Sequence, residues 1–206
     1  MDEQERAGDR HGDRAEAARR RLVEAAVEAF AAKGFHGTTT RDIAAAAGMS
    51  PAALYIHHRS KEELLYLISR DGHAATLDLV RSARAGADGS VAQLRAVAGA
   101  FARHHAESPT IARIVNYELA ALDEPHAREI DDLRHAIDVE LRDLIAAGVE
   151  DGSFDCPDPR LAAAALLSLG VDLARWYREG LPWSPADLER AYADLATRLV
   201  GATDAD

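Results

Sequence analysis

The stretch that decides the fold is residues 39–57, which read TTRDIAAAAGMSPAALYIH. Its first part predicts a short helix over residues 40–47. Thr39 precedes that helix and offers a hydroxyl oxygen to its free backbone N–H groups, and Asp42, three residues later, completes a capping box. The stretch therefore opens on a helix whose start is fixed by its own side chains.

Gly48 follows at the point where a left-handed residue is needed, and glycine adopts that conformation at the least cost. Ser50 and Pro51 then begin a second short helix, predicted over residues 51–57, with serine as its cap and proline in its first turn. The apolar residues that would hold the two helices at a fixed angle are Ile43, Ala44, Ala47, Met49 and Leu54. This spacing is that of a helix-turn-helix.

A helix-turn-helix places the N-terminal end of its second helix in the major groove of double-stranded DNA. Ala52 and Ala53, directly after Pro51, are small, so the backbone can approach the bases and the alanine methyl groups can touch a thymine methyl. Arg41 is the side chain best placed for a guanine or a phosphate. The side chains that fit phosphate contacts are Thr39, Thr40, Tyr55, His57 and Lys61. We expect these residues to form an operator-binding surface.

The same region resembles the TetR family of bacterial repressors. The resemblance is carried by TTRDIA at 39–44, AGMSP at 47–51, Leu54, Tyr55, His57, SKEELL at 60–65, and AVEAFAAKGFHG at 26–37, which is similar to that family's first helix and its exit. It implies a homodimer, an all-helical body with a ligand cavity, and release of DNA when a small-molecule effector binds. The sequence departs from the family pattern at His58, where an aromatic residue is usual, and at Ala52, where glycine is common.

Outside this region the chain also predicts helix, because alanine and leucine recur at spacings of three and four and strand-like alternation is absent. Ser108, Asp158 and Ser184 each precede a proline and mark further helix starts, and Ser60 with Glu63 forms a second capping box. The predicted fold class is all-α with about nine helices. They are expected at residues 16–33, 40–47, 51–57, 61–84, 90–106, 109–121, 124–148, 158–179 and 185–200.

The predicted organisation is a disordered arm over residues 1–18, a helix-turn-helix DNA-binding domain over 19–65, and a ligand-binding and dimerisation domain over 66–206. The arm is polar and carries charges of both signs. The net charge is −11, but residues 19–70 carry eight Lys/Arg against five Asp/Glu, whereas 71–206 carry thirteen against twenty-four. A mildly basic head on an acidic body suits a protein that presents only its head to DNA.

The last two predicted helices each have an apolar face. The residues on these faces are Ala162, Ala165, Leu166, Leu169, Leu173, Leu188, Tyr192, Leu195 and Leu199. Paired with a second copy of the chain, the two helices would form a four-helix dimer interface. The alternative is that these faces close the core of one chain.

Parts of the body resemble acyl-CoA-responsive TetR-family repressors of lipid or steroid breakdown. These are NYELAAL at 116–122, the turn at 148–154 and RWY at 175–177. The resemblance implies that Arg113 and Arg175 meet ligand phosphates, that Trp176 and Tyr177 bound the ligand, and that Tyr117 lies near it. The alternative for the aromatic residues is ordinary packing, and an acidic body is an awkward host for a polyanion.

No enzymatic activity is predicted, because the sequence holds no nucleophile elbow, phosphate-cradling glycine loop or metalloprotease pair. Cys156, the one cysteine, lies between Asp155 and Pro157 beside acidic residues and is interpreted as a partly buried structural thiol. Adjacent histidines cannot converge on one ion from a helix, which argues against metal binding at His104 and His105 or at His57 and His58. No metal and no cofactor is expected.

The longest apolar stretch, residues 161–171, is much shorter than the roughly 20 residues of a membrane span. A single cysteine suits a reducing cytosol, so a cytoplasmic protein without membrane association is expected. The alternative function is a helical dimeric interaction protein that has lost DNA binding, suggested by the changes at His58 and Ala52. Against it stands the set Thr39, Arg41, Tyr55 and Lys61, which a scaffold would not need.

Overall fold

The computed structural model describes residues 3–178 and 180–203, with side chains from residue 14 onward. Over these residues the chain is helical apart from its connections and one antiparallel bridge between Phe154 and Ala202. The helices are α1 (Glu3–Gly37), α2 (Thr40–Ala46), α3 (Pro51–His57), α4 (Lys61–Ala85), α5 (Ser90–Glu107), α6 (Pro109–Tyr117), η1 (Leu119–Ala121), α7 (Glu124–Glu150), α8 (Pro159–Trp176) and α9 (Pro185–Leu199). The predicted all-α class is confirmed.

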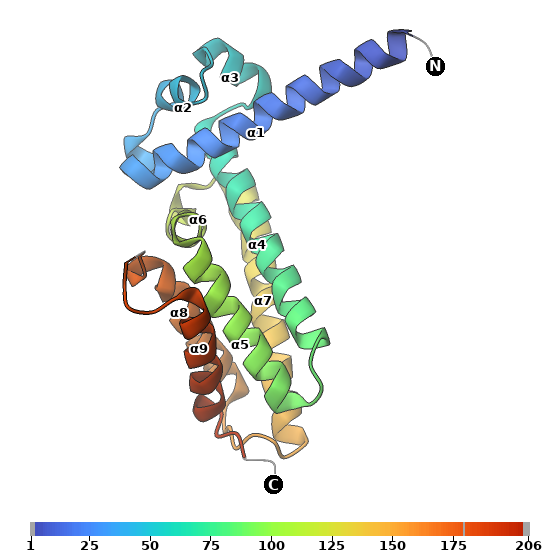
Figure 1. Cartoon of the computed structure of the whole chain (residues 1–206), viewed down its shortest axis with the longest axis vertical. Coiled ribbons are helices and arrows are strands. Elements are labelled where there is room, and N and C mark those ends of the chain that lie inside the picture. The colour runs from blue at the N-terminus through green and yellow to red at the C-terminus, as the bar shows by residue number, and fades with distance from the viewer. Residues whose placement is uncertain (1–2, 179, 204–206) are drawn as a thin grey trace.

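The helices form a head and a body (Figure 1). The head consists of α1, α2 and α3, and α4 runs from it into the body. Within the body α4 packs against α5 and α7, α8 packs on α5 and α7, and α9 packs on α5. The short α6 lies between head and body and contacts α1, α4 and α8. This position makes α6 the connection between the two parts.

The N-terminal helix differs from the sequence prediction at its start. Residues 1–18 are predicted to form a disordered arm, but α1 begins at Glu3 and extends away from the body (Figure 1). Alanine, glutamate and arginine are good helix formers, and lengthening a helix that the head already holds requires no new nucleation. The helical geometry breaks at Gly34, which has φ 69° and ψ 168°, where the sequence places the end of the helix.

The predicted helix starts are confirmed where a side chain is hydrogen-bonded to the first turn, at Ser50, Asp158 and Ser184. Ser108 is different, because its side chain makes no capping bond. The capping box predicted at Ser60 is only half formed: Ser60 Oγ accepts from the Glu63 N–H at 3.0 Å. The Glu63 carboxylate instead accepts from the N–H of Arg59, one residue further back.

Two predicted helices end early. The helix expected over 109–121 stops at Tyr117 and is followed by the separate η1 turn. The helix expected over 158–179 ends at Trp176, because the backbone of Tyr177 is extended; residue 179 lies outside the described residues.

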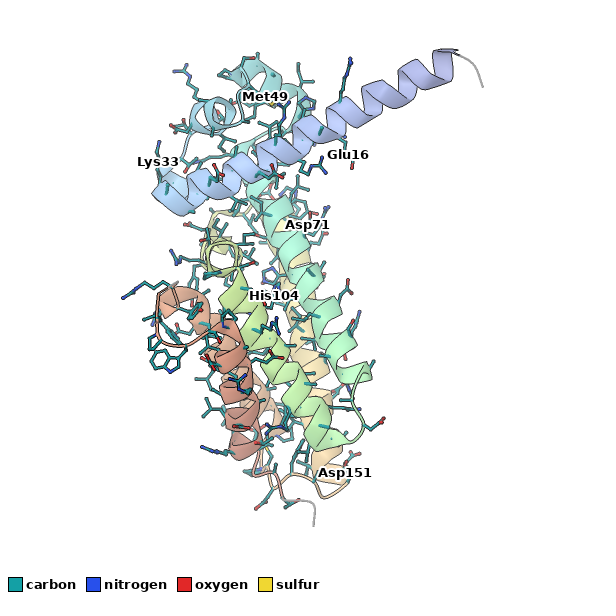
Figure 2. All side chains as sticks on the ribbon, viewed as in Figure 1. Glu16, Lys33, Met49, Asp71, His104 and Asp151 are labelled. Carbon is teal, nitrogen blue, oxygen red and sulfur yellow. The ribbon has the colours of Figure 1, made fainter. Side chains whose placement is uncertain are left out.

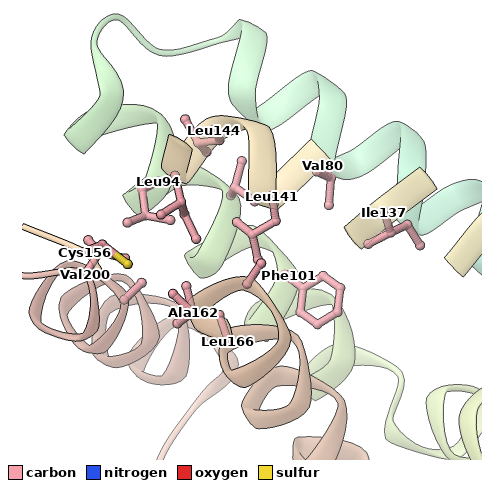
Figure 3. Packing of buried hydrophobic residues seen from close by; sticks show 14 of the residues in the cluster. Val80, Leu94, Phe101, Ile137, Leu141, Leu144, Cys156, Ala162, Leu166 and Val200 are labelled. Carbon is pink, nitrogen blue, oxygen red and sulfur yellow. The ribbon is translucent and has the colours of Figure 1, made fainter. Parts of the chain in front are cut away.

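Three clusters of buried apolar side chains stabilise the described part of the chain, and the smallest contains Leu173, Tyr177 and Leu188. In the body, α4, α5, α7, α8 and α9 bury a cluster that includes Leu141 and Phe101, with Cys156 at one end (Figure 3). Cys156 is a buried free thiol. In the head, α1, α2, α3 and α4 bury a second cluster, and α6 contributes Ile114 and Val115 to it. The head core is therefore completed by a helix that belongs to the body.

No helix in the described part of the chain is both long and apolar enough to cross a membrane.

The packing of α7 against the loop that follows it predicts a sensitive position. A Cβ atom at Gly148 would lie 2.1 Å from Cδ2 of Phe154, a side chain buried in the body core. We expect Gly148→Ala to lower the free energy of unfolding by about 1–3 kcal/mol, measured by urea unfolding, because the ring has to leave its position. At Gly86 the nearest heavy atom would be 3.4 Å away, so Gly86→Ala serves as the control. Equal stability of the two variants would contradict this packing argument.

Candidate nucleic-acid interface and buried cavity

The turn between α2 and α3 has the geometry that the sequence predicts. Gly48 is left-handed with φ 67°, and the Met49 N–H donates to the carbonyl of Ala44 at 2.8 Å. Met49 lies between the two helices (Figure 2). Ile43 and Leu54 are completely buried and fix the angle between α2 and α3. The predicted helix-turn-helix is confirmed.

The start of α2 is held by a complete capping box. Thr39 Oγ1 accepts from the Asp42 N–H at 3.2 Å, and the Asp42 carboxylate accepts from the Thr39 N–H at 2.9 Å. Lys33 at the end of α1 forms an ion pair with the same carboxylate at 2.9 Å. The hydrogen bond from the Thr39 hydroxyl, followed by that from Lys33, holds the pKa of Asp42 well below its usual range. Thr39 thus has a structural role besides its predicted phosphate contact.

The outer face of α3 is the exposed surface of the helix-turn-helix. Tyr55 is 56% exposed and Ile56 is 78% exposed, while Ala52 is exposed one turn earlier. The sequence analysis does not include Ile56 in the interface. The helical repeat predicts that Ile56 is exposed, because Leu54 points inwards and residues 52, 55 and 56 then lie on the opposite side of the helix. An isoleucine this exposed is a candidate for contact with thymine methyl groups.

The other predicted DNA contacts are distributed around this face. Thr40 Oγ1 and the Tyr55 hydroxyl lie 3.2 Å apart, so the structure brings these two together across α2 and α3. Arg41 is exposed and makes no ion pair within the described part of the chain. Pro51 is exposed, whereas Ala53 and His57 are half-buried.

Lys61 occupies a more enclosed position than the sequence suggests. Its Nζ donates to the carbonyls of Phe35 and Thr38, both at 2.8 Å, and lies 4.2 Å from the centroid of the Phe35 ring. The ammonium group therefore joins the start of α4 to the end of α1. Two of its three hydrogens are used, and one remains for a phosphate.

His58 takes the place of the family's usual aromatic residue. Its side chain is buried, and its Nε2 atom has no hydrogen-bond partner among the described residues. Burial lowers the pKa of this imidazole. His58 therefore fills the core position as a neutral ring.

A cluster of polar side chains joins head and body where α4 and α7 begin. Glu62 Oε1 accepts from Nδ1 of His126 at 2.8 Å and from the Asp123 N–H at 3.1 Å. The Tyr66 ring stacks on His126, with centroids 3.8 Å apart, and its hydroxyl donates to Glu129. The hydrogen bond to Glu62 raises the pKa of His126.

The junction also holds three side chains of metal-ligating types, at positions that the argument from adjacent histidines does not cover. Ligand atoms of Glu62, Asp123 and His126 lie within 4.8 Å of one another, an arrangement that could hold a metal ion. The prediction that no metal binds rests on pairs of adjacent histidines and stays a prediction. Here one histidine meets two carboxylates, and Glu62 is far away in the sequence. Each group already has a hydrogen-bond partner in the protein.

A cavity of about 80 Å³ lies between helices of the body and is open to solvent on one side, where the exposed Arg134 lies. The residues that line it come from α4, α5, α6, α7 and α8: His73, Thr76, Phe101, His105, Val115, Asn116, Arg134, Ile137, Leu167 and Val171. A smaller apolar cavity of about 20 Å³ is lined by Phe101, Ile137 and Leu167 as well, and continues towards α9. The combined space is mostly apolar with a few polar groups, the usual character of a small-molecule site.

The residues predicted to bind ligand do not line this cavity. Arg113 and Tyr177 line a separate open cleft between the ends of α5, α6 and α8. Tyr117 and Arg175 are brought together at another place, where both contact Asp172, at 3.4 and 3.0 Å. Trp176 lies at the surface, edge-on to Tyr177 and Trp183. Their role in ligand binding stays a prediction.

None of the residues that line the cavity is among the predicted ligand contacts, and His73 and His105 are its buried titratable side chains. Both occupy core-facing positions of otherwise apolar helix faces, four residues or fewer from buried leucine or phenylalanine. A histidine at a core-facing position is the feature of the sequence that could have indicated the cavity. A core that needs no polar group favours an aliphatic side chain there.

Comparison with known proteins identifies the family. Residues 22–66 match the description "Bacterial regulatory proteins, tetR family", and residues 87–200 match "Tetracyclin repressor-like, C-terminal domain". The chain belongs to the tetR family. The HTH-type transcriptional repressor KstR2 of Mycolicibacterium smegmatis is 32% identical, over 88% of this chain and 89% of its own.

Solved structures of the tetR family have the same fold. A regulatory protein from Rhodococcus RHA1 superimposes with a TM-score of 0.86 at 38% identity, covering 91% of this chain and 98% of its own. The ketosteroid transcriptional regulator KstR2 of Mycobacterium tuberculosis gives a TM-score of 0.81 at 26% identity, covering 91% and 95%.

The buried His105 predicts how the stability of this tetR-family protein varies with pH. Burial lowers the pKa of His105 from 6.5 to about 4. Between these values the unfolded chain binds the proton and the folded chain does not, so the free energy of unfolding falls as the pH falls. We expect His105→Phe to reduce this slope by up to about 1.4 kcal/mol per pH unit, measured by urea unfolding between pH 4 and 7. An unchanged slope would show that His105 titrates alike in both states.

Proposed function

We propose that this protein is a DNA-binding transcriptional regulator of the repressor type, which leaves a palindromic operator when a hydrophobic effector enters its body. The exposed outer face of α3 carries the proposal. There Tyr55 and Ile56 project from a helix whose inner side is fixed by the buried Leu54. Arg41 stands beside them without an ion-pair partner in the described residues. The kinship with KstR2, an HTH-type transcriptional repressor, supports the same conclusion.

The path from effector to DNA leads through α6. Val115 lines the cavity and also belongs to the buried cluster of the head. Three residues later, Glu118 Oε1 accepts from the Phe35 N–H at the end of α1, at 3.4 Å. A ligand that pushes Val115 outwards therefore acts on the packing that holds α1. Because the two heads of a dimer must match two half-sites, a small rotation of each head lowers operator affinity.

The dimer interface we propose uses only part of the predicted set. Ala162, Leu166, Leu173 and Leu188 are buried within one chain, so for them the alternative of closing the core applies. The leucines of these faces that stay exposed are Leu169, Leu195 and Leu199, and Leu161, outside the predicted set, is exposed as well. Exposed leucines on two adjacent helices favour an isologous contact with a second copy.

The effector we propose is hydrophobic, and the acyl part of a CoA thioester is one candidate. A cavity of about 80 Å³ is smaller than the roughly 150 Å³ that holds a benzene ring, so it has to widen to admit a ring or a branched chain. The open cleft at Arg113 and Tyr177 adjoins the same stretches of α5 and α6. It would then receive the polar remainder of the ligand.

One observation favours the alternative function, a helical dimeric scaffold that has lost DNA binding. Thr39 and Lys61 are engaged in bonds that hold the head together, so a scaffold has its own need for them. The distinction between the two functions therefore rests on Arg41, Tyr55 and Ile56, which are exposed.

Titration of the protein into labelled DNA from upstream of its own gene, followed by fluorescence anisotropy, tests the proposed function. Selective binding that weakens steeply with salt supports a regulator. If the protein binds this DNA no more tightly than unrelated DNA, and a selection from random DNA also yields no preferred sequence, the regulator function is excluded. The scaffold function is then favoured.

Variants of the interface should separate two kinds of contact. We expect Tyr55→Ala to weaken binding to all sequences and to reduce the salt slope by about 1. Lys61→Ala should do the same, with its stability measured in parallel because of its bonds to α1. Arg41→Ala should also alter the preferred base. Arg160→Ala, exposed in the first turn of α8, is the control. Wild-type affinity for all three head variants would exclude this interface.

Gly72 offers a test of the path through α6. A Cβ atom at Gly72 would lie 2.9 Å from Cγ2 of Val115, so Gly72→Ala displaces Val115 much as an effector would. We expect operator affinity without effector to fall about tenfold, a coupling free energy of roughly 1.4 kcal/mol, while the circular dichroism spectrum stays helical. Unchanged affinity would mean that α6 does not transmit the signal.

A further inference from the structure

Two buried histidines face the cavity from neighbouring helices. His73 on α4 is 4% exposed and His105 on α5 is 3% exposed. Nδ1 of His73 lies 2.8 Å from the carbonyl of Ser69, and Nδ1 of His105 lies 2.9 Å from the carbonyl of Phe101. A carbonyl only accepts, so each Nδ1 carries the proton and donates it. In both rings Nε2 is then a lone-pair acceptor.

His73 has an acceptor without a partner. Its Nε2 is buried and makes no hydrogen bond with the described residues. Burial lowers the pKa of both imidazoles, so at neutral pH they are neutral acceptors. The charged groups that act on His73 are Arg134 and Asp131 of α7, with opposite effects. A buried polar atom left unpaired is unfavourable, and a ligand that donates to it removes this penalty.

The other polar groups of the wall add acceptors. The Thr76 hydroxyl donates to the carbonyl of Gly72 at 2.8 Å, which leaves its oxygen able only to accept. Asn116 donates one N–H to the carbonyl of Ala112 at 2.8 Å and keeps its amide oxygen and one further N–H. The rest of the wall is apolar, except for the exposed Arg134. The buried part of the cavity therefore offers more acceptors than donors.

We propose that the effector carries a hydroxyl group on the apolar part that enters this cavity, and that Nε2 of His73 accepts its hydrogen bond. This inference rests on the proposed function and specifies its ligand class: a small alicyclic or branched alcohol, or a larger molecule that ends in one. A ketone or an ester carbonyl at the same place meets the lone pair of Nε2 and forms no bond. A plain hydrocarbon leaves Nε2 unpaired.

Cyclohexanol and cyclohexanone are suitable probes, because they are similar in size and only the alcohol donates. Binding of each to the full-length protein is measured by calorimetry at pH 7.5. We expect cyclohexanol to bind about fivefold more tightly, the usual value of one neutral hydrogen bond. In His73→Phe this preference should vanish. His104→Phe is the matched control, because His104 is half-buried on α5 but does not line the cavity.

Equal or tighter binding of the ketone, or a preference that persists in His73→Phe, would overturn the proposal. So would the absence of binding by both probes up to their solubility. Should His73→Phe not fold, ¹⁵N NMR of the wild-type protein decides: cyclohexanol must shift the assigned Nε2 resonance of His73 to lower frequency, cyclohexanone must not, and an unmoved resonance contradicts the proposal.

Operator binding is measured separately on the same protein. If operator DNA binds but the probes are not distinguished, only the assignment of the ligand class fails. If the alcohol is preferred but no operator binds, the regulator function fails and the cavity still selects alcohols.

Discussion

Val115 packs against the backbone of α4 so closely that a methyl group at Gly72 would lie 2.9 Å from its Cγ2 atom. Because α6 and α4 approach this closely, the Val115 side chain belongs both to the buried cluster of the head and to the wall of the cavity. Close-packed side chains do not deform continuously, and a displaced group forces its neighbours into another arrangement. The position of the head is therefore tied to the packing around the cavity.

The elements of the head could be predicted from the sequence because their determinants are local. Gly48 ends α2 through its own backbone, and Thr39 and Asp42 bond to each other within one turn. Such signals lie within four residues and do not depend on the rest of the fold. The two failures of capping show the limit of this reasoning. Ser108 precedes a proline yet leaves its side chain without a capping bond, and Glu63 bonds one residue beyond the expected donor, since more than one free N–H lies in reach.

The candidate sites were only partly predictable, because their contacts join distant parts of the chain. Lys61 looked like a phosphate contact, and nothing in its neighbourhood reveals that its ammonium group bonds to carbonyls more than twenty residues earlier. Glu62 and His126 meet across 64 residues. The aromatic residues near Trp176 suggested ligand contacts by their chemistry, but α8 ends there and leaves the tryptophan at the surface. The position of the cavity depends on how α4, α5 and α7 pack against one another. The spacing of residues within one helix does not predict this packing.

His73 and His105 show how such a cavity still leaves a trace in the sequence. An imidazole in a close-packed core is less favourable than a leucine, because its polar atoms lose their hydration. One nitrogen of each ring regains a bond from the carbonyl four residues earlier in the same helix. That bond needs no ligand, and it leaves the second nitrogen as an acceptor, which in His73 is buried and has no partner among the described residues. A core that served stability alone would have no use for that acceptor. A cavity that has to distinguish one apolar molecule from another does, since apolar contacts alone discriminate weakly while an unpaired buried acceptor penalises every ligand that cannot donate.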